Sequence, residues 1–295
     1  MKESIHLPHT AIRFLNRLRL DLALQWQVLA ILQATLSVWL VQETQQDQGI
    51  TLLAVVIWGG AAICIEDKLE GFQVRPSRAS LLAGTVLLAY ATWRSWVVLD
   101  MDSVVYVLPV LQGLGLVLMA RPVRQLFSLK PALIVLSLFP LQFLAFKLLP
   151  EYWLSVSTGK VGQILLQLFS INAVAAGRML TIGSNGVAIQ PACSGAGQIA
   201  GLTVTAIVFV MAYPIKSWFS KACFLAMAPL LGYLINACRI SILALIVTSN
   251  MPQRDWLFDF FHEEWGGLVF SGIATIILGQ IYISMVDRQL NAHHD

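Results

Sequence analysis

Long apolar runs are the feature that most limits how this chain can fold. Crossing a hydrocarbon core of about 30 Å takes about 20 apolar residues in a helix. Hydrophobic residues make up 57% of the sequence and charged residues only 12%, about half the charged fraction of a soluble domain. The sequence therefore predicts an all-α fold, a polytopic membrane bundle of about eight transmembrane helices, and it excludes a water-soluble globule. We expect these helices at 22–41, 50–65, 79–99, 103–120, 131–149, 194–213, 222–249 and 265–286.

The positions of the Lys and Arg residues predict which segments face the cytoplasm. With the N-terminus inside, the inner segments hold 13 of the 19 Lys and Arg residues, and the outer segments hold only Lys160, Arg178 and Arg254. Cytoplasmic loops of membrane proteins collect positive charge. We therefore expect a multi-pass protein of the cytoplasmic (inner) membrane with both termini in the cytoplasm. The net charge of +3 is spread along the chain and indicates no nucleic-acid partner.

One connection, 150–192, is too long for a simple turn, and the predicted topology places it on the outer face. Residues 162–176 within it are apolar but interrupted by polar side chains, which favours an interfacial helix. The strand-like stretches around Asn185-Gly186 predict a hairpin. We expect a single transmembrane domain over 1–295, with five spans in 1–149, this extracytoplasmic connection in 150–192, and three further spans in 193–286.

Cys193 is the cysteine with the clearest chemical meaning. Three of the four cysteines lie inside apolar runs, whereas Cys193 lies among turn residues where the sixth span begins, so a disulfide framework is not expected. A helix N-terminus stabilises a thiolate, the nucleophilic form of cysteine. Ser194 and Gly195 leave room around the sulfur and allow another backbone to approach. The alternative is that Cys193 is a small residue at a helix start and that the glycines form a helix-packing face.

Asn236 and Arg239 project from one face of the seventh predicted span. An arginine inside an apolar run costs a few kcal/mol to insert, and such residues normally face a polar cavity or a partner. The alternative for Arg239 is a structural lock between helices. Asn236 could equally serve only as interhelical hydrogen-bonding glue.

His262 follows an aromatic-rich segment, 256–261, which we expect to be an outer loop, and it precedes the last span. A lone interfacial histidine is usually incidental, but the predicted topology brings it to the same side of the membrane as Cys193 and Arg239. A thiol, an imidazole and a guanidinium together suit acyl transfer. The thiolate attacks a carbonyl, the imidazole transfers protons, and the guanidinium stabilises the oxyanion or orients the peptide.

Three segments, in this order and on eight predicted spans, resemble the exosortase/archaeosortase family. They are Ala192-Cys193-Ser194-Gly195, Asn236-Ala237-Cys238-Arg239-Ile240, and His262 followed by Gly266 and Gly267. The match lies within about 150–285, whereas the first five spans match only in hydropathy.

The resemblance implies a membrane-embedded cysteine protease or transpeptidase. Cys193 would be the nucleophile, Arg239 the transition-state stabiliser and His262 the proton-transfer partner, with Asn236, Ser194 and Gly195 in support. The implied partners are exported proteins with a C-terminal sorting tail, made of a short Pro-Glu-Pro type motif, a hydrophobic helix and a basic end. Membrane lipid is a further expected partner, and no metal or organic cofactor is suggested.

Two other classes of function remain open at this point. A transporter or lipid flippase would use Arg239 and Asn236 as a midplane binding site and Cys193 as a structural residue. A non-catalytic assembly factor would tolerate substitution of Cys193, Arg239 and His262. An exposed Cys193 of low pKa would favour the enzyme, and an inert thiol with Arg239-dependent uptake would favour the transporter.

Overall fold

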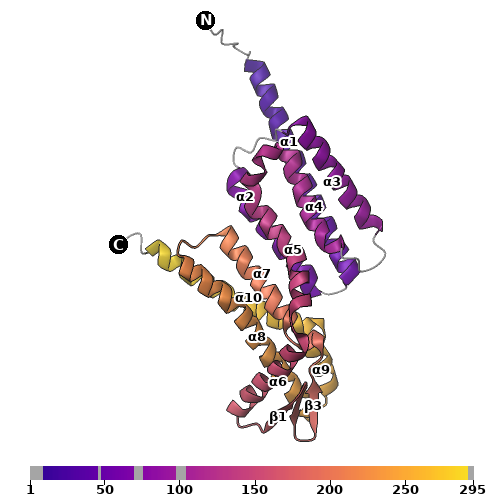
Figure 1. Cartoon of the computed structure of the whole chain (residues 1–295), viewed down its shortest axis with the longest axis vertical. Coiled ribbons are helices and arrows are strands. Elements are labelled where there is room, and N and C mark those ends of the chain that lie inside the picture. Colours follow the sequence, from indigo (N-terminus) through magenta and orange to yellow (C-terminus); the bar gives the residue numbers. More distant parts are fainter. Residues whose placement is uncertain (1–8, 46–47, 70–75, 98–103, 292–295) are drawn as a thin grey trace. The chain divides into compact units, whose positions relative to one another are not determined.

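The computed structural model describes residues 9–45, 48–69, 76–97 and 104–291 (Figure 1). These residues are mostly helical, and the helices follow the apolar runs. The α-helices are α1 His9–Gln45, α2 Gln48–Leu69, α3 Arg78–Val97, α4 Val104–Ala120, α5 Lys130–Leu148, α6 Glu151–Leu168, α7 Ala196–Ala212, α8 Trp218–Thr248, α9 Arg254–His262 and α10 Glu264–Asn291. Two 3-10 helices, η1 Val123–Leu129 and η2 Pro191–Cys193, and three strands, β1 Ala173–Ala176, β2 Met179–Ile182 and β3 Asn185–Ala188, complete the described elements.

Each of the eight predicted spans overlaps a helix, and residues 98–99 and 103 of two of these spans lie outside the described residues. Four segments of the described chain are long and apolar enough to cross a membrane, namely Leu24–Thr44, Gln48–Ile65, Trp218–Thr248 and Trp265–Gln289. The apolar helices in α4, α5 and α7 are shorter. The chain is thus an all-α multi-pass membrane protein in its main architecture, while the total of eight spans stays a prediction.

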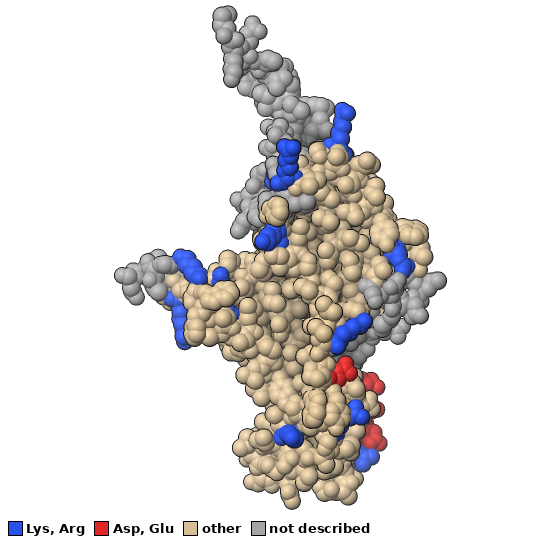
Figure 2. All heavy atoms as spheres, in the orientation of Figure 1, with Lys and Arg blue, Asp and Glu red and all other residues tan. Residues whose placement is uncertain are grey.

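Most outward side chains of α8 and α10 are apolar. In α8, Leu230 and Leu234 are exposed, and in α10 so are Ile273, Ile276 and Ile283. Contiguous exposed apolar side chains are unusual on soluble monomers but normal where lipid covers them. Figure 2 agrees, since most of the visible described surface is uncharged and the Lys and Arg side chains are scattered.

The chain divides into two compact units, one of Met1–Thr44 and Trp58–Ser137 and one of Gln45–Ile57 and Leu138–Asp295. The single-domain organisation stays a prediction. In the first unit, α3 and α4 pack closely at two glycines. A Cβ on Gly84 would lie 2.7 Å from the carbonyl oxygen of Gly115, so only glycine permits this approach.

In the second unit, α7, α8 and α10 pack against one another around a core that includes Phe224, Ala274 and Leu278. The strands, α6 and α9 gather near the C-terminal end of α8 (Figure 1). A second core lies there, in which Leu180 and Ile189 of the strand region pack with Ile240 and Leu243 of α8. All the candidate site residues lie in this unit.

The connection 150–192 differs in detail from the sequence prediction. The helix there, α6, begins at Glu151 and ends at Leu168, so the prediction of a helix over 162–176 is wrong in its bounds. Residues 173–176 instead form β1, which pairs with β2 in an antiparallel three-stranded sheet of order β1-β2-β3. Hydrogen bonding to β2 decides against a helix there.

The strands β2 and β3 form an antiparallel hairpin, but its turn is not at Asn185-Gly186. Ile182 pairs with Asn185, so the turn residues are Gly183 and Ser184. Gly183 has φ +62°, in the left-handed region that hairpin turns require and glycine tolerates. The Asn-Gly pair belongs to β3.

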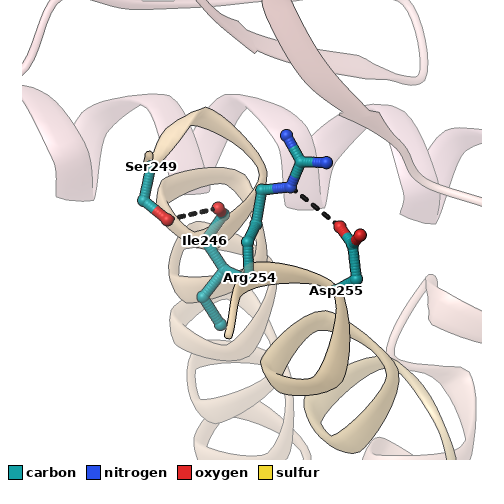
Figure 3. Close-up of polar contacts among 4 residues, drawn as sticks. All are labelled: Ile246, Ser249, Arg254 and Asp255. Atoms are coloured by element: carbon teal, nitrogen blue, oxygen red, sulfur yellow. Dashed lines mark hydrogen bonds and ion pairs between the residues drawn. The ribbon is translucent and has the colours of Figure 1, made fainter. Parts of the chain in front are cut away.

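The segment between α8 and α10 is a helix rather than the expected loop. α8 ends where the hydroxyl of Ser249 donates to the carbonyl of Ile246 over 2.8 Å, and α9 then begins at Arg254, whose Nε lies 2.9 Å from the carboxylate of Asp255 (Figure 3). Leu257, Phe258, Phe261 and His262 are partly buried on one side of α9. Their spacing in the sequence is typical of a helix, and the sequence analysis missed it because it considered only the aromatic composition of the segment.

Candidate active site

Cys193 lies in the 3-10 turn that leads from the sheet into α7. Its side chain is buried, with 5% exposed, and packs in the core that the sheet shares with α8. The backbone reverses at Gly195, which has φ +96° and precedes the first residue of α7. The expected position of Cys193 beside a helix N-terminus is thus observed.

The thiol of Cys193 does not have the low pKa that its position beside a helix suggested. Burial raises the pKa of the thiol, and the positive charge of Arg239 opposes this effect without overcoming it. The helix start therefore does not lower the pKa of the thiol, because desolvation of the sulfur outweighs the positive charge of Arg239. The free protein holds Cys193 as a neutral thiol at neutral pH.

His262 is the last residue of α9 and contacts Cys193. Its Nδ1 lies 3.7 Å from the Cys193 Sγ, within hydrogen-bonding distance for sulfur. The imidazole packs against the ring of Phe258, with the ring centroids 5.1 Å apart. An imidazole in this position can accept the thiol proton, as a general base does.

Arg239 lies in α8 with only 8% of the residue exposed. Its Nε donates to the carbonyl oxygen of Phe261 over 2.9 Å, and its Nη2 donates to that of His262 over 2.6 Å. The guanidinium therefore binds the backbone at the end of α9. Its charge is also close enough to the Cys193 sulfur to affect the pKa of the thiol.

Asn236 holds the backbone of Cys193. Its side-chain amide donates to the Cys193 carbonyl over 3.0 Å, and the residue is 2% exposed. Gly195 packs directly on this amide, since a Cβ there would lie 2.8 Å from Asn236 Nδ2. Asn236 thus contacts Cys193 and Gly195 contacts Asn236, while their expected support of the reaction stays a prediction.

Thr158 of α6 is a site residue that the sequence analysis missed. Its hydroxyl donates to the carbonyl of Ser194 over 2.9 Å, so the carbonyls of Cys193 and Ser194 are held from two different helices. Ser194 itself is fully buried. The signal was the small-residue face of α6, because Ser155, Thr158, Gly159 and Gly162 are four of its five buried positions and small residues at this spacing mark close helix contacts.

The candidate residues of all three segments therefore come together in one unit. Backbone carbonyls accept hydrogen bonds from Nδ2 of Asn236 and from two nitrogens of Arg239, so both side chains bind the backbone of the protein. The four cysteines are all free. Among the described residues, no group of three or more His, Cys, Asp or Glu side chains is placed to hold a metal ion.

Comparison with known protein families places the chain in one of them. The family model for transmembrane exosortases matches residues 39–279, more than four fifths of the chain. No curated protein and no solved structure matches.

Proposed function

Because this chain belongs to the transmembrane exosortase family, we propose that it is a cysteine protease or transpeptidase that removes the C-terminal sorting tail of exported proteins. The contact between the Cys193 Sγ and His262 Nδ1 is the observation that carries the proposal. A buried thiol paired with an imidazole suits nucleophilic catalysis. The resemblance supplies the substrate class, a short Pro-Glu-Pro type motif followed by a hydrophobic helix and a basic end.

The proposed reaction begins with the neutral thiol. When the scissile carbonyl reaches Cys193, His262 Nδ1 accepts the thiol proton as the sulfur bonds to the carbonyl carbon. The C–N bond then breaks, His262 returns the proton to the leaving amine, and a thioester remains on Cys193. Water or an amine on a second molecule resolves the thioester, which gives hydrolysis or transfer.

Burial of the site affects this reaction in two ways. The raised pKa of Cys193 keeps the nucleophile protonated until a base removes its proton, so His262 acts in every turnover. Exclusion of bulk water slows hydrolysis of the thioester and favours transfer to an amine.

We also propose that the protein lies in the cytoplasmic membrane with both termini inside and the site on the outer side. The distribution of Lys and Arg supports this orientation. A cysteine placed at the exposed turn residue Ser184 of a cysteine-free variant should react with a membrane-impermeant thiol reagent on intact cells. One placed at Asn291, near the end of α10, should react only after the cells are opened.

The proposed activity is tested by co-expression with a tailed substrate, a reporter protein followed by the motif, a hydrophobic helix and basic residues. Cys193→Ala should abolish removal of the tail, whereas Cys223→Ser, at an exposed cysteine of α8, should process the reporter normally. Undiminished processing by Cys193→Ala would eliminate the mechanism.

A further inference from the structure

Arg239 binds the end of the helix that bears His262. The last four carbonyls of a helix have no partner within it, and two of these in α9 belong to Phe261 and His262. The Nε and Nη2 donors of Arg239 meet them over 2.9 and 2.6 Å. A guanidinium is rigid and planar, so two donors on one edge fix two successive carbonyls in a single geometry.

We propose that Arg239 is a positioning residue, which acts on the reaction by holding His262 against Cys193. This role differs from the one expected from the sequence, in which Arg239 stabilises the oxyanion. Both donors on the Nε–Nη2 edge are used by backbone carbonyls. The remaining nitrogen, Nη1, lies near Gly267, 3.9 Å from the position that an added Cβ would take.

Asn236 supplies the other half of the arrangement. It lies one helical turn before Arg239 in α8 and donates to the carbonyl of Cys193, while Arg239 donates to the carbonyl of His262. Residues three apart share one helix face. Side chains of one rigid helix, α8, therefore hold both Cys193 and His262, although 69 residues separate these two in the sequence.

In the part of the chain that the structure describes, Arg239 is the side chain that donates to the carbonyls at the end of α9. The backbone N–H of Glu263 donates within α9, to Asp259. Gly266 packs so closely that a Cβ there would lie 2.4 Å from the Phe261 Cα, which brings the start of α10 against the end of α9. Without the guanidinium, two carbonyls in this confined turn would lose their donors, and the turn would move to find others.

The experiment measures alkylation of Cys193 by iodoacetamide in detergent, with Cys64, Cys223 and Cys238 replaced by serine. Alkylation forms an S–C bond, releases iodide and passes the thiol proton to the base. No oxyanion forms, so a residue that only stabilises an oxyanion leaves the rate unchanged. This proposal rests on the proposed cysteine chemistry, yet the assay needs no substrate protein, so failure of tail cleavage and failure of positioning are observed separately.

A double-mutant cycle gives the decisive comparison. Loss of an outer hydrogen bond to a metal ligand typically costs about 10- to 100-fold in activity, and by analogy Arg239→Ala should slow alkylation at neutral pH by at least about tenfold. In the His262→Ala background the same change should slow it by no more than about threefold, the part due to the charge acting directly on the thiol. An unchanged rate with His262 present, or equal slowing in both backgrounds, would overturn the proposal.

Two further variants test whether the slower alkylation comes only from the loss of an arginine or of its charge. Arg254→Ala removes an exposed arginine of α9 that pairs with Asp255 and should alkylate at the parent rate. Arg239→Lys keeps a cation beside Cys193 but lacks the planar pair of donors, so it should lose less than Arg239→Ala, and that loss should again vanish with His262→Ala. If Arg239→Ala does not fold, the cycle is run with Arg239→Lys, and equal slowing in both backgrounds contradicts the proposal in the same way.

Discussion

The Sγ of Cys193 lies 3.7 Å from Nδ1 of His262, and each residue is held by a different side chain of α8. The thiol is buried and the imidazole is partly exposed. The pair is therefore a neutral thiol beside an imidazole, and not a preformed thiolate–imidazolium ion pair. Several measurable properties depend on this arrangement.

The first concerns the pH dependence of the thiol. Because burial raises the pKa of Cys193, its thiolate fraction keeps increasing beyond the pH at which an ordinary cysteine ionises. In the His262→Ala variant, where no imidazole contributes, the alkylation rate should therefore rise without a plateau through that range. Rates measured from about pH 6 to about pH 10 would span the ordinary thiol pKa. A plateau near or below neutral pH would show a stabilised thiolate and contradict this account.

Gly195 should not accept a side chain. Its φ of +96° and the 2.8 Å from an added Cβ to Asn236 Nδ2 mean that Gly195→Ala strains the turn and displaces the amide that holds Cys193. We expect greatly reduced tail removal and a lower melting temperature. Gly201→Ala is the matched control, because no atom lies within 4 Å of a Cβ there. Similar behaviour of the two variants would show that the turn at Gly195 is not constrained.

Asn236→Ala should destabilise the fold as well as slow the reaction. The change leaves the Cys193 carbonyl without its donor in a site where Asn236 is 2% exposed, and an unsatisfied buried group costs about 1 to 3 kcal/mol. Thermal unfolding in detergent would measure the loss, with the exposed Asn250→Ala as control. An unaltered melting temperature would remove Asn236 from the account of how Cys193 is held.

Thr158→Val tests the support from α6. Valine keeps the volume of threonine but cannot donate to the Ser194 carbonyl, so the free energy of unfolding should fall by about 1 kcal/mol and tail removal should slow. Thr203→Val makes the same change where the hydroxyl bonds only to its own helix, at Ile199. If both variants behave alike, the contact between α6 and the turn contributes nothing specific.

Much of the fold was predictable from the apolar runs. A run such as 104–120 has one stable solution in a membrane, a helix that satisfies its own backbone, and the observed α4 agrees with the prediction over 103–120. Shorter elements were less predictable. β1 depends on hydrogen bonds to β2, and α9 depends on packing of Phe258 and Phe261 against the core around Cys193. A local sequence pattern does not predict either kind of contact.

The sequence predicted the main residues of the candidate site, but it did not predict the pKa of the thiol or the hydrogen bonds of Arg239. Cys193, Arg239 and His262 were identified by residue type and order, and the structure brings them together. The raised pKa of the thiol and the contacts of Arg239 to two carbonyls follow from burial and from the exact place where α9 ends. Those properties can be seen only in the folded chain. The same is true of the hydrogen bond from Thr158, which lies 35 residues before Cys193 in the sequence.

Capture of the covalent intermediate tests the central claim most directly. The protein in membranes is mixed with the tailed reporter, quenched in acid and digested, and the peptides that contain Cys193 are examined by mass spectrometry. We expect a peptide of the reporter that lies just before the cleaved bond, with the carbonyl of its last residue bound to Cys193 as a thioester that hydroxylamine releases. Removal of the tail with no such adduct on Cys193, or with the adduct on another residue, would contradict the account.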